Sequence, residues 1–234
     1  MTISELSIKR IFNELFKKIH NLEAFLYSRF HKNPLVRTVG DSHVMAFKKD
    51  INFFIDDIGP ATAFNLKNKE STTRSNEKLF KIIKKIDKRN DIVMLSFGEI
   101  DCRNHIYNEY KKSKEKISIS KLINQTIANY GEVLQKLKEE EIRFCVLGVP
   151  PAGHQENIYG FTYYAPVETR VLINREFNEK LANFCREKGF KFINLYQKVV
   201  DERGFILKEF AADKIHLNEK VVPFVRHEII RLFD

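Results

Sequence analysis

The chain of 234 residues contains no tryptophan and only three cysteines, Cys102, Cys145 and Cys185. With so few thiols, we expect no disulfide framework, and the spacing of the cysteines matches no zinc pattern. No apolar run approaches the roughly 18 residues that a membrane-spanning helix needs. The N-terminus also lacks the apolar region and small-residue cleavage site of a secretory signal. We therefore expect a cytoplasmic protein, with peripheral membrane association as the alternative.

Acidic residues are in the minority, with 31 Asp and Glu against 40 Lys and Arg, which gives a formal net charge of +9. Much of the excess lies in residues 67–90 and 111–116. These stretches are typical of a solvated helix face and a loop, or they attract an anionic substrate or membrane surface. A nucleic-acid partner is not expected, because no known binding motif accompanies the lysines.

Residues 3–30 carry apolar side chains at helical spacing, which predicts an amphipathic helix that ends before Pro34. We therefore divide the chain into an N-terminal helical extension, 1–33, and a domain, 34–234. The apolar side of the extension has three alternative partners: the domain itself, a second copy in a homodimer, or a membrane surface.

Within the domain, short apolar segments alternate with longer amphipathic ones. Strands are expected at "LVRTVG", "NFFIDDIG", "DIVMLSFG", "IRFCVLGV" and "FKFINL". Helices are expected to begin at "SHVMAFKK" and to cover 75–89, 120–140, 168–188 and the C-terminal segment. This alternation predicts an α/β fold, a doubly wound parallel sheet with helices on both faces. In such sheets, ligands bind at the carboxyl ends of the strands.

Ser42 follows the first expected strand, where the chain turns into a helix. A hydroxyl at a helix N-terminus lies beside free backbone N–H groups that favour developing negative charge. The alternative is that Ser42 or Asp41 simply caps the helix.

Asp213 and His216 are three residues apart in an expected turn after the last strand. A serine nucleophile needs a base within hydrogen-bond reach, and the base needs an acceptor that fixes its tautomer. An Asp-x-x-His turn can supply both groups, although such a pair is also common in ordinary surface turns.

The combination resembles the SGNH hydrolases, also called GDSL-type esterases and lipases. Four segments carry the resemblance, in the family's order: "VGDSH", "IGPATA", "LSFGEID" and "DKIHLN". It implies a three-layer α/β/α sandwich with a flavodoxin-like sheet of five parallel strands. It also implies an ester hydrolase or O-acyltransferase that needs no cofactor and no metal.

The resemblance assigns roles residue by residue. Ser42 would be the nucleophile, His216 the base and Asp213 its orienter, and the backbone N–H groups of Ser42 and Gly59 would bind the oxyanion. The implied substrate is a small-molecule or glycan ester, with O-acetyl esters of a carbohydrate or polysaccharide precursor expected.

Two positions depart from the family pattern. The usual Gly-Asp-Ser-Leu reads Gly-Asp-Ser-His, which introduces His43. The third block normally contains an asparagine that donates to the oxyanion, and Ile100 stands there instead. Arg103 and His105 are the nearest alternative donors. "FGEIDCR" resembles the third block of a divergent bacterial branch that is often linked to surface polysaccharide.

Polar and aromatic residues of the same loops are candidates for substrate binding. They are Asp41, His43, Glu99, Asp101, Arg103, His154, Tyr163 and Arg170. The loop that begins "PPAGHQENIYGFTYY" is the expected specificity loop, where the tyrosines either stack on a sugar or pack the loop onto the domain.

Two alternative functions remain open. Asp41 and His43 could share a metal ion, with Glu99, Asp101 and His216 as further ligands, in a metal-dependent phosphoesterase. Further motifs of that enzyme class are missing from the sequence. Alternatively, the loss of the asparagine at Ile100 favours a non-catalytic module that binds a glycan or a protein.

Overall fold

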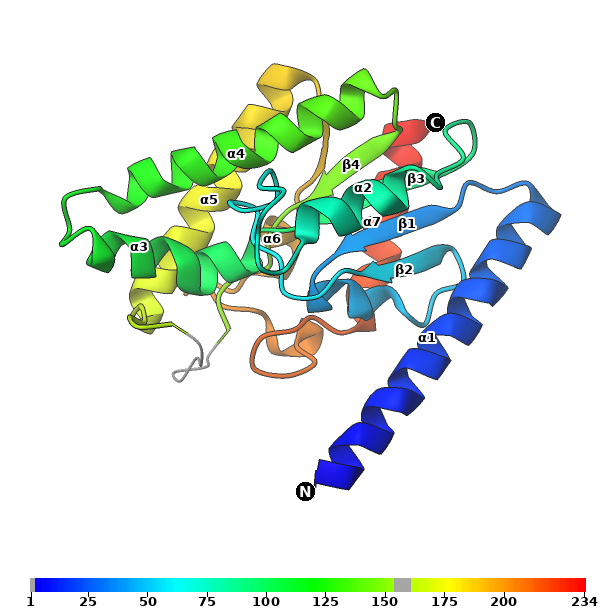
Figure 1. Cartoon of the computed structure of the whole chain (residues 1–234), viewed down its shortest axis with the longest axis horizontal. Helices are drawn as coiled ribbons and strands as arrows, with labels where there is room; N and C mark the ends of the chain where they lie inside the picture. The colour runs from blue at the N-terminus through cyan, green and yellow to red at the C-terminus, as the bar shows by residue number, and fades with distance from the viewer. Residues whose placement is uncertain (1–2, 154–160) are drawn as a thin grey trace.

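The computed structural model describes residues 3–153 and 161–234. Its centre is a parallel sheet of five strands in the order β2-β1-β3-β4-β5 (Figure 1). The strands are β1 (Val36–Gly40), β2 (Phe53–Asp57), β3 (Ile92–Ser96), β4 (Phe144–Leu147) and β5 (Lys191–Ile193). The five expected strands and their parallel arrangement are confirmed.

Helices cover both faces of this sheet. One face packs against α2 (Ser75–Ile83), α3 (Ile106–Lys112), α4 (Ile119–Glu139) and α5 (Val167–Lys188). The other packs against the 3-10 helix η1 (Ser42–Phe47), α6 (Leu195–Val199) and α7 (Val222–Phe233). Shorter helical turns are η2 (Asp101–His105), η3 (Lys208–Phe210) and η4 (Glu219–Val221). The fold is the predicted three-layer sandwich.

Strand β3 shows how the sequence builds two cores. Every residue of this strand is buried. Val93 and Leu95 belong to the core beneath α4 and α5, whereas Ile92 and Met94 belong to the core beneath α7. Alternate side chains of a strand point to opposite faces, so a central strand covered on both sides is apolar throughout.

The connection from β1 to β2 differs from the expected helix. Only the 3-10 helix η1 forms, and it ends at Phe47. The Asp50 carboxylate accepts from the backbone N–H of Asn52 at 2.9 Å, and the Phe53 N–H donates to the Asp50 carbonyl at 3.0 Å. This local turn competes with helical hydrogen bonding and brings the chain directly into β2.

The N-terminal helix α1 (Ile3–His31) lies along β2, the edge strand of the sheet (Figure 1). His20 Nε2 lies 2.8 Å from the Phe53 carbonyl oxygen. The Asn21 amide donates to the Ile55 carbonyl at 2.9 Å and accepts from the Ile55 N–H at 2.8 Å. These side chains satisfy an edge that would otherwise be open to another strand. Across the described ranges, no helix is long and apolar enough to cross a membrane.

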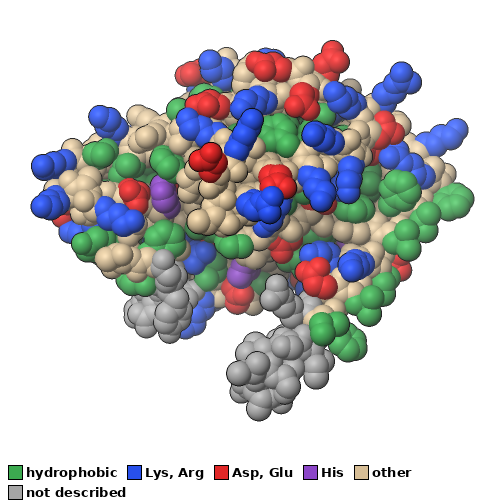
Figure 2. Space-filling view, viewed as in Figure 1, with side chains coloured by type: hydrophobic (Ala, Val, Ile, Leu, Met, Phe, Trp, Pro, Cys, Tyr) green, Lys and Arg blue, Asp and Glu red, His purple; other side chains and the backbone are tan. Residues whose placement is uncertain are grey.

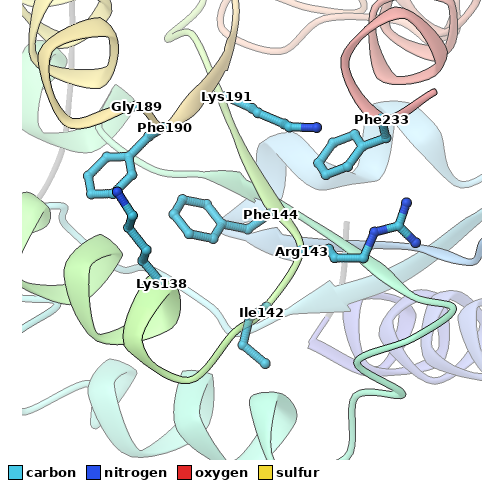
Figure 3. Close-up of a pocket in the computed structure, with 8 residues that line it drawn as sticks. All are labelled: Lys138, Ile142, Arg143, Phe144, Gly189, Phe190, Lys191 and Phe233. Atoms are coloured by element: carbon cyan, nitrogen blue, oxygen red, sulfur yellow. The ribbon is translucent and has the colours of Figure 1, made fainter.

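A cavity of about 250 Å³ opens at the amino ends of β4 and β5 (Figure 3). Three cations line it, and each already donates to a backbone carbonyl: Lys138 to Lys188, Arg143 to Arg89 and Lys191 to Leu232. We therefore assign these cations a structural role, because each connects two segments that are distant in sequence. The candidate site lies at the opposite, carboxyl edge of the sheet.

Candidate active site

The candidate site lies at the carboxyl ends of β1 and β3. With the strand order 2-1-3-4-5, the chain leaves β1 toward one side of the sheet and β3 toward the other, which opens a crevice between them. A Cβ at Gly40 would lie 2.3 Å from the Ser96 carbonyl oxygen, so only glycine permits this approach. The loops that carry Ser42 and Glu99 begin from this junction.

Ser42, His216 and Asp213 form one hydrogen-bonded series. Ser42 Oγ lies 3.0 Å from His216 Nε2, and His216 Nδ1 lies 2.8 Å from Asp213 Oδ2. Ser42 is exposed, and the side chains of His216 and Asp213 are 33% and 57% exposed. The geometry is that of a hydroxyl beside a base whose second nitrogen faces a carboxylate.

The turn that holds Asp213 is built from its own backbone. Asp213 Oδ1 accepts from the N–H groups of Ile215 and His216, both at 2.8 Å. Partial burial raises the pKa of Asp213, but these hydrogen bonds and His216 outweigh it, so the net pKa is lowered. Asp213 therefore stays ionised and can hold the His216 Nδ1–H.

Gly153 lies against this turn; the sequence places it in the expected specificity loop but assigns it no role. A Cβ there would lie 1.8 Å from the Lys214 carbonyl oxygen. The neighbouring Ala152 pairs with Phe205 in an isolated parallel bridge. The loop after β4 thus supports the Asp213–His216 turn, and only a glycine leaves room for the contact. The sequence signal was the Gly153 that follows a strand and two prolines.

Asp41 is buried directly before Ser42. Its Oδ1 accepts from the His43 backbone N–H at 3.0 Å, which caps η1. Burial raises the pKa of Asp41 to about 6, against the opposing effect of His43. Asp41 therefore stabilises the turn that carries Ser42. Only 2% of Asp41 is exposed, which leaves almost no surface for a substrate.

His43, Glu99 and Arg103 form a second, buried network. His43 Nε2 lies 3.4 Å from Glu99 Oε2, and Arg103 Nε donates to Glu99 Oε1 at 2.6 Å. Burial raises the pKa of Glu99, but His43 and Arg103 outweigh it and bring the pKa to about 2. Burial lowers the pKa of His43, but Glu99 and Asp41 outweigh it, and the net pKa is raised. Glu99 is therefore an anion that the Arg103 guanidinium holds, and it lies beside the His43 ring.

The oxyanion donors need a correction. The Gly59 N–H donates to Asp57 Oδ1 at 2.8 Å, so the predicted donor is already engaged by a carboxylate two residues before it. Ser42 begins η1, where the first N–H groups of a helix have no partner within the helix. Ile100 supplies no side-chain donor.

Two predicted substrate contacts are buried instead. Both carboxylate oxygens of Asp101 accept backbone N–H groups, from Ala63 at 2.6 Å and Phe64 at 3.1 Å. Burial raises the pKa of Asp101 to about 7, although these hydrogen bonds oppose it. Asp101 therefore supports the loop after β2. Arg170 is fully enclosed on the inner side of α5, which leaves it no surface for a substrate.

The remaining candidates are peripheral. Tyr163 is exposed and therefore open to a substrate, and its backbone N–H donates to Asn108 Oδ1 at 3.3 Å. His154, another predicted substrate contact, lies outside the described residues. The His105 side chain is mostly buried, and its ring is tilted against the Phe64 ring with 4.6 Å between the centroids, so it is not placed as an oxyanion donor.

No protein-family model matches the sequence, and no curated protein matches it either. Solved structures do match its fold. A GDSL-like lipase from Bacteroides thetaiotaomicron is 14% identical with a TM-score of 0.58, and the match covers 86% of this chain and 88% of that one.

A proposed acylhydrolase from Bacteroides fragilis is 12% identical with a TM-score of 0.53, covering 86% of this chain and 88% of that chain. The C-terminal domain of the Drosophila Oskar protein is 10% identical with a TM-score of 0.50, covering 84% and 86%. Identities this low establish architecture, while function must be argued from the site itself. The chain has the fold of the SGNH, or GDSL-type, hydrolases, as the sequence predicted.

Proposed function

We propose that this protein is a serine-dependent ester hydrolase or O-acyltransferase that acts through Ser42, His216 and Asp213. The observation that carries the proposal is the Ser42 Oγ to His216 Nε2 distance of 3.0 Å, continued to Asp213 at 2.8 Å. A hydroxyl, a base and an orienting carboxylate in this series are what nucleophilic acyl transfer requires.

The reaction has two stages. Ser42 Oγ attacks the acyl carbon while His216 Nε2 takes its proton, and Asp213 stabilises the imidazolium that forms. The leaving alcohol then receives the proton from His216, which leaves the acyl group as an ester on Ser42. Water or a second hydroxyl, deprotonated by His216, attacks this ester and releases Ser42. The choice between them separates a hydrolase from a transferase.

The Ser42 N–H and Arg103 are our candidates for oxyanion stabilisation. Arg103 has five N–H donors, and Glu99 holds it through Nε. In this proposal, the remaining N–H donors of Arg103 take over from the asparagine that the family pattern has at the position of Ile100. Loss of one oxyanion donor lowers the rate by about 10²–10³.

For the substrate, we propose an O-acetyl ester on a carbohydrate. The triad is open to solvent, which suits a bulky alcohol. Tyr163 and Tyr164 are exposed aromatic side chains of the expected specificity loop. The three cysteines are buried free thiols, in keeping with a reducing compartment such as the cytoplasm.

The test is hydrolysis of p-nitrophenyl acetate by the wild type, Ser42→Ala and the control Ser71→Ala. We expect only Ser42→Ala to lose activity, while circular dichroism shows that it stays folded. Equal rates for wild type and Ser42→Ala would reject Ser42 as the nucleophile.

A non-catalytic glycan- or protein-binding module is the second candidate. Two observations favour it: Ile100 replaces a donor, and Asp57 occupies the Gly59 N–H. This candidate predicts no reaction of Ser42 with a fluorophosphonate, whereas the hydrolase predicts labelling. The phosphoesterase alternative gains no support, because the described residues include no group of three or more His, Cys, Asp and Glu side chains arranged to hold a metal.

A further inference from the structure

The two faces of α1 have opposite character. The inner face lies against the domain, and its buried residues are small or polar: His20, Ala24 and Ser28. Asn21 on the same face hydrogen-bonds to β2. A surface helix normally turns its apolar stripe toward the core, so this arrangement is reversed.

The outer face carries nine large apolar side chains that are 41–82% exposed. They are Ile11, Phe12, Leu15, Phe16, Ile19, Leu22, Phe25, Leu26 and Phe30. Figure 2 shows hydrophobic side chains along the outer edge of this helix, and Figure 1 shows its N-terminal half projecting beyond the sheet. Monomeric proteins rarely expose a continuous apolar surface of this size, and an unsupported helix is only marginally stable in water.

The spacing of the outer residues is that of a coiled-coil seam. Phe12, Leu15, Ile19, Leu22 and Leu26 alternate at intervals of three and four, which places them at heptad positions a and d. The inner-face residues then fall at positions b, c and f. The seam therefore points directly away from β2, and the domain does not obstruct a second helix.

The flanking positions indicate a parallel pair. In a parallel coiled coil, each g position lies beside the e position of the following heptad on the other helix. The resulting partners are Ile11 with Phe16, Lys18 with Glu23, and Phe25 with Phe30. Each pair is either apolar on both sides or opposite in charge. An antiparallel pair places g beside g and e beside e, and it loses the Lys18–Glu23 match.

We propose that α1 binds the α1 of a second copy of this chain in a parallel coiled coil. At ~100 Å² for each exposed side chain, the nine residues would bury ~900 Å² per chain, about what a stable interface needs. Beyond Leu26 the next d position is Arg29, which pairs with Asp87 at 3.2 Å and Asp91 at 3.4 Å and ends the seam.

The charges favour a second copy over a lipid surface. A helix that lies in a membrane interface keeps its charged residues on the polar face. Lys18 and Glu23 instead lie beside the apolar seam, where a partner helix of the same sequence neutralises both of them.

The first test is the mass of the full chain in solution, by light scattering after size exclusion. We expect twice the 27.6 kDa of one chain. Leu15→Glu combined with Leu22→Glu should give a folded monomer. The control Leu172→Glu, at a 60% exposed leucine of α5, should remain a dimer. A monomeric wild type, or a double variant that stays dimeric, would overturn the proposal.

Two further arms separate the alternatives. In a parallel pair Leu22 meets its own copy, so Leu22→Cys should form a disulfide-linked dimer on oxidation and Leu172→Cys should not. Flotation with vesicles of phosphatidylcholine and phosphatidylglycerol tests the lipid surface. A dimer without the Leu22→Cys cross-link would overturn the parallel orientation, and a wild type that is monomeric and floats with vesicles would assign the face to lipid.

Discussion

Two histidines lie side by side at the end of β1, with ring centroids 4.8 Å apart, and their surroundings are opposite. His216 is partly exposed, and it joins the exposed Ser42 to Asp213. His43 is buried and faces Glu99, which Arg103 also holds. Only His216 has a nitrogen beside the hydroxyl and a carboxylate that fixes the other nitrogen.

The difference shows that burial and hydrogen-bond partners, more than residue type, decide whether a histidine at this edge of the sheet can act on a substrate. The exposed series can exchange a proton with a substrate, because solvent and substrate reach it. In the network of His43, Glu99 and Arg103, removal of the Glu99 anion would leave the Arg103 charge without its partner. We therefore expect substitutions in the first to affect rate alone and substitutions in the second to affect stability as well.

The largest effect is expected from His216→Gln. The variant removes the proposed base, so kcat/KM for p-nitrophenyl acetate should fall by about 10⁴-fold or more. Its melting temperature should hardly change, since the side chain is partly exposed. His227→Gln, at an exposed histidine of α7, is the matched control and should keep the wild-type rate. A His216→Gln variant of near wild-type rate would remove His216 from the mechanism.

Glu99→Gln should lower both stability and rate. It leaves His43 and Arg103 without their shared anion, and breaking a buried pair of this kind costs about 3–5 kcal/mol in free energy of unfolding. Loss of the anchor for Arg103 should reduce the rate by about 10²-fold. Urea unfolding and ester hydrolysis measure the two effects.

Asp213→Asn is the control for Glu99→Gln, because it changes an exposed carboxylate of the site instead of a buried one. It should lose activity and keep the wild-type unfolding midpoint. If Glu99→Gln unfolds at the same urea concentration as the wild type, the buried network is not a structural unit.

Gly153→Ala should give a smaller loss of rate. The added methyl group would lie 1.8 Å from the Lys214 carbonyl oxygen, so the Asp213–His216 turn must move. A displacement of about 1 Å at a catalytic group can cost up to about 10²-fold, and we expect at least tenfold in kcat. An unchanged kcat would show that the loop after β4 does not position the turn.

The last prediction concerns the pH dependence of stability and needs no loss of activity. The pKa of Asp41 is about 6 in the folded protein against a usual 3.8, so the unfolded chain releases this proton first. Wild-type stability should therefore fall as pH rises from about 4 to about 6, by on the order of 2–3 kcal/mol from this group. Asp41→Asn keeps a capping side chain and should flatten that slope. An identical slope in urea unfolding at several pH values would contradict the assignment.

The fold could be predicted because the strands leave a strong local signal. "DIVMLSFG" is apolar without interruption, and β3 is buried on both faces. The helix predicted to begin at Ser42 is present but is a short 3-10 helix that ends at Phe47. Asp50 and Asn52 form a turn soon after it, and apolar periodicity does not reveal their side-chain hydrogen bond.

The sequence suggested the candidate triad because its members are close in sequence or directly follow a strand. Asp213 and His216 share one turn, and Ser42 follows β1. The hydrogen bond from the Gly59 N–H to Asp57 could not be predicted, because it depends on the conformation of the loop after β2. The burial of Arg170 follows from helical spacing. Arg170 lies three and seven residues before the buried Ile173 and Phe177, which places it on the inner face of α5.

The most direct test of the central claim is covalent labelling by a fluorophosphonate, mapped by mass spectrometry. The account predicts one label per chain, on Ser42, and labelling that is slowed strongly in His216→Gln but not in His227→Gln. An unlabelled wild type, or a label on any other residue, would contradict the claim that Ser42 is an activated nucleophile.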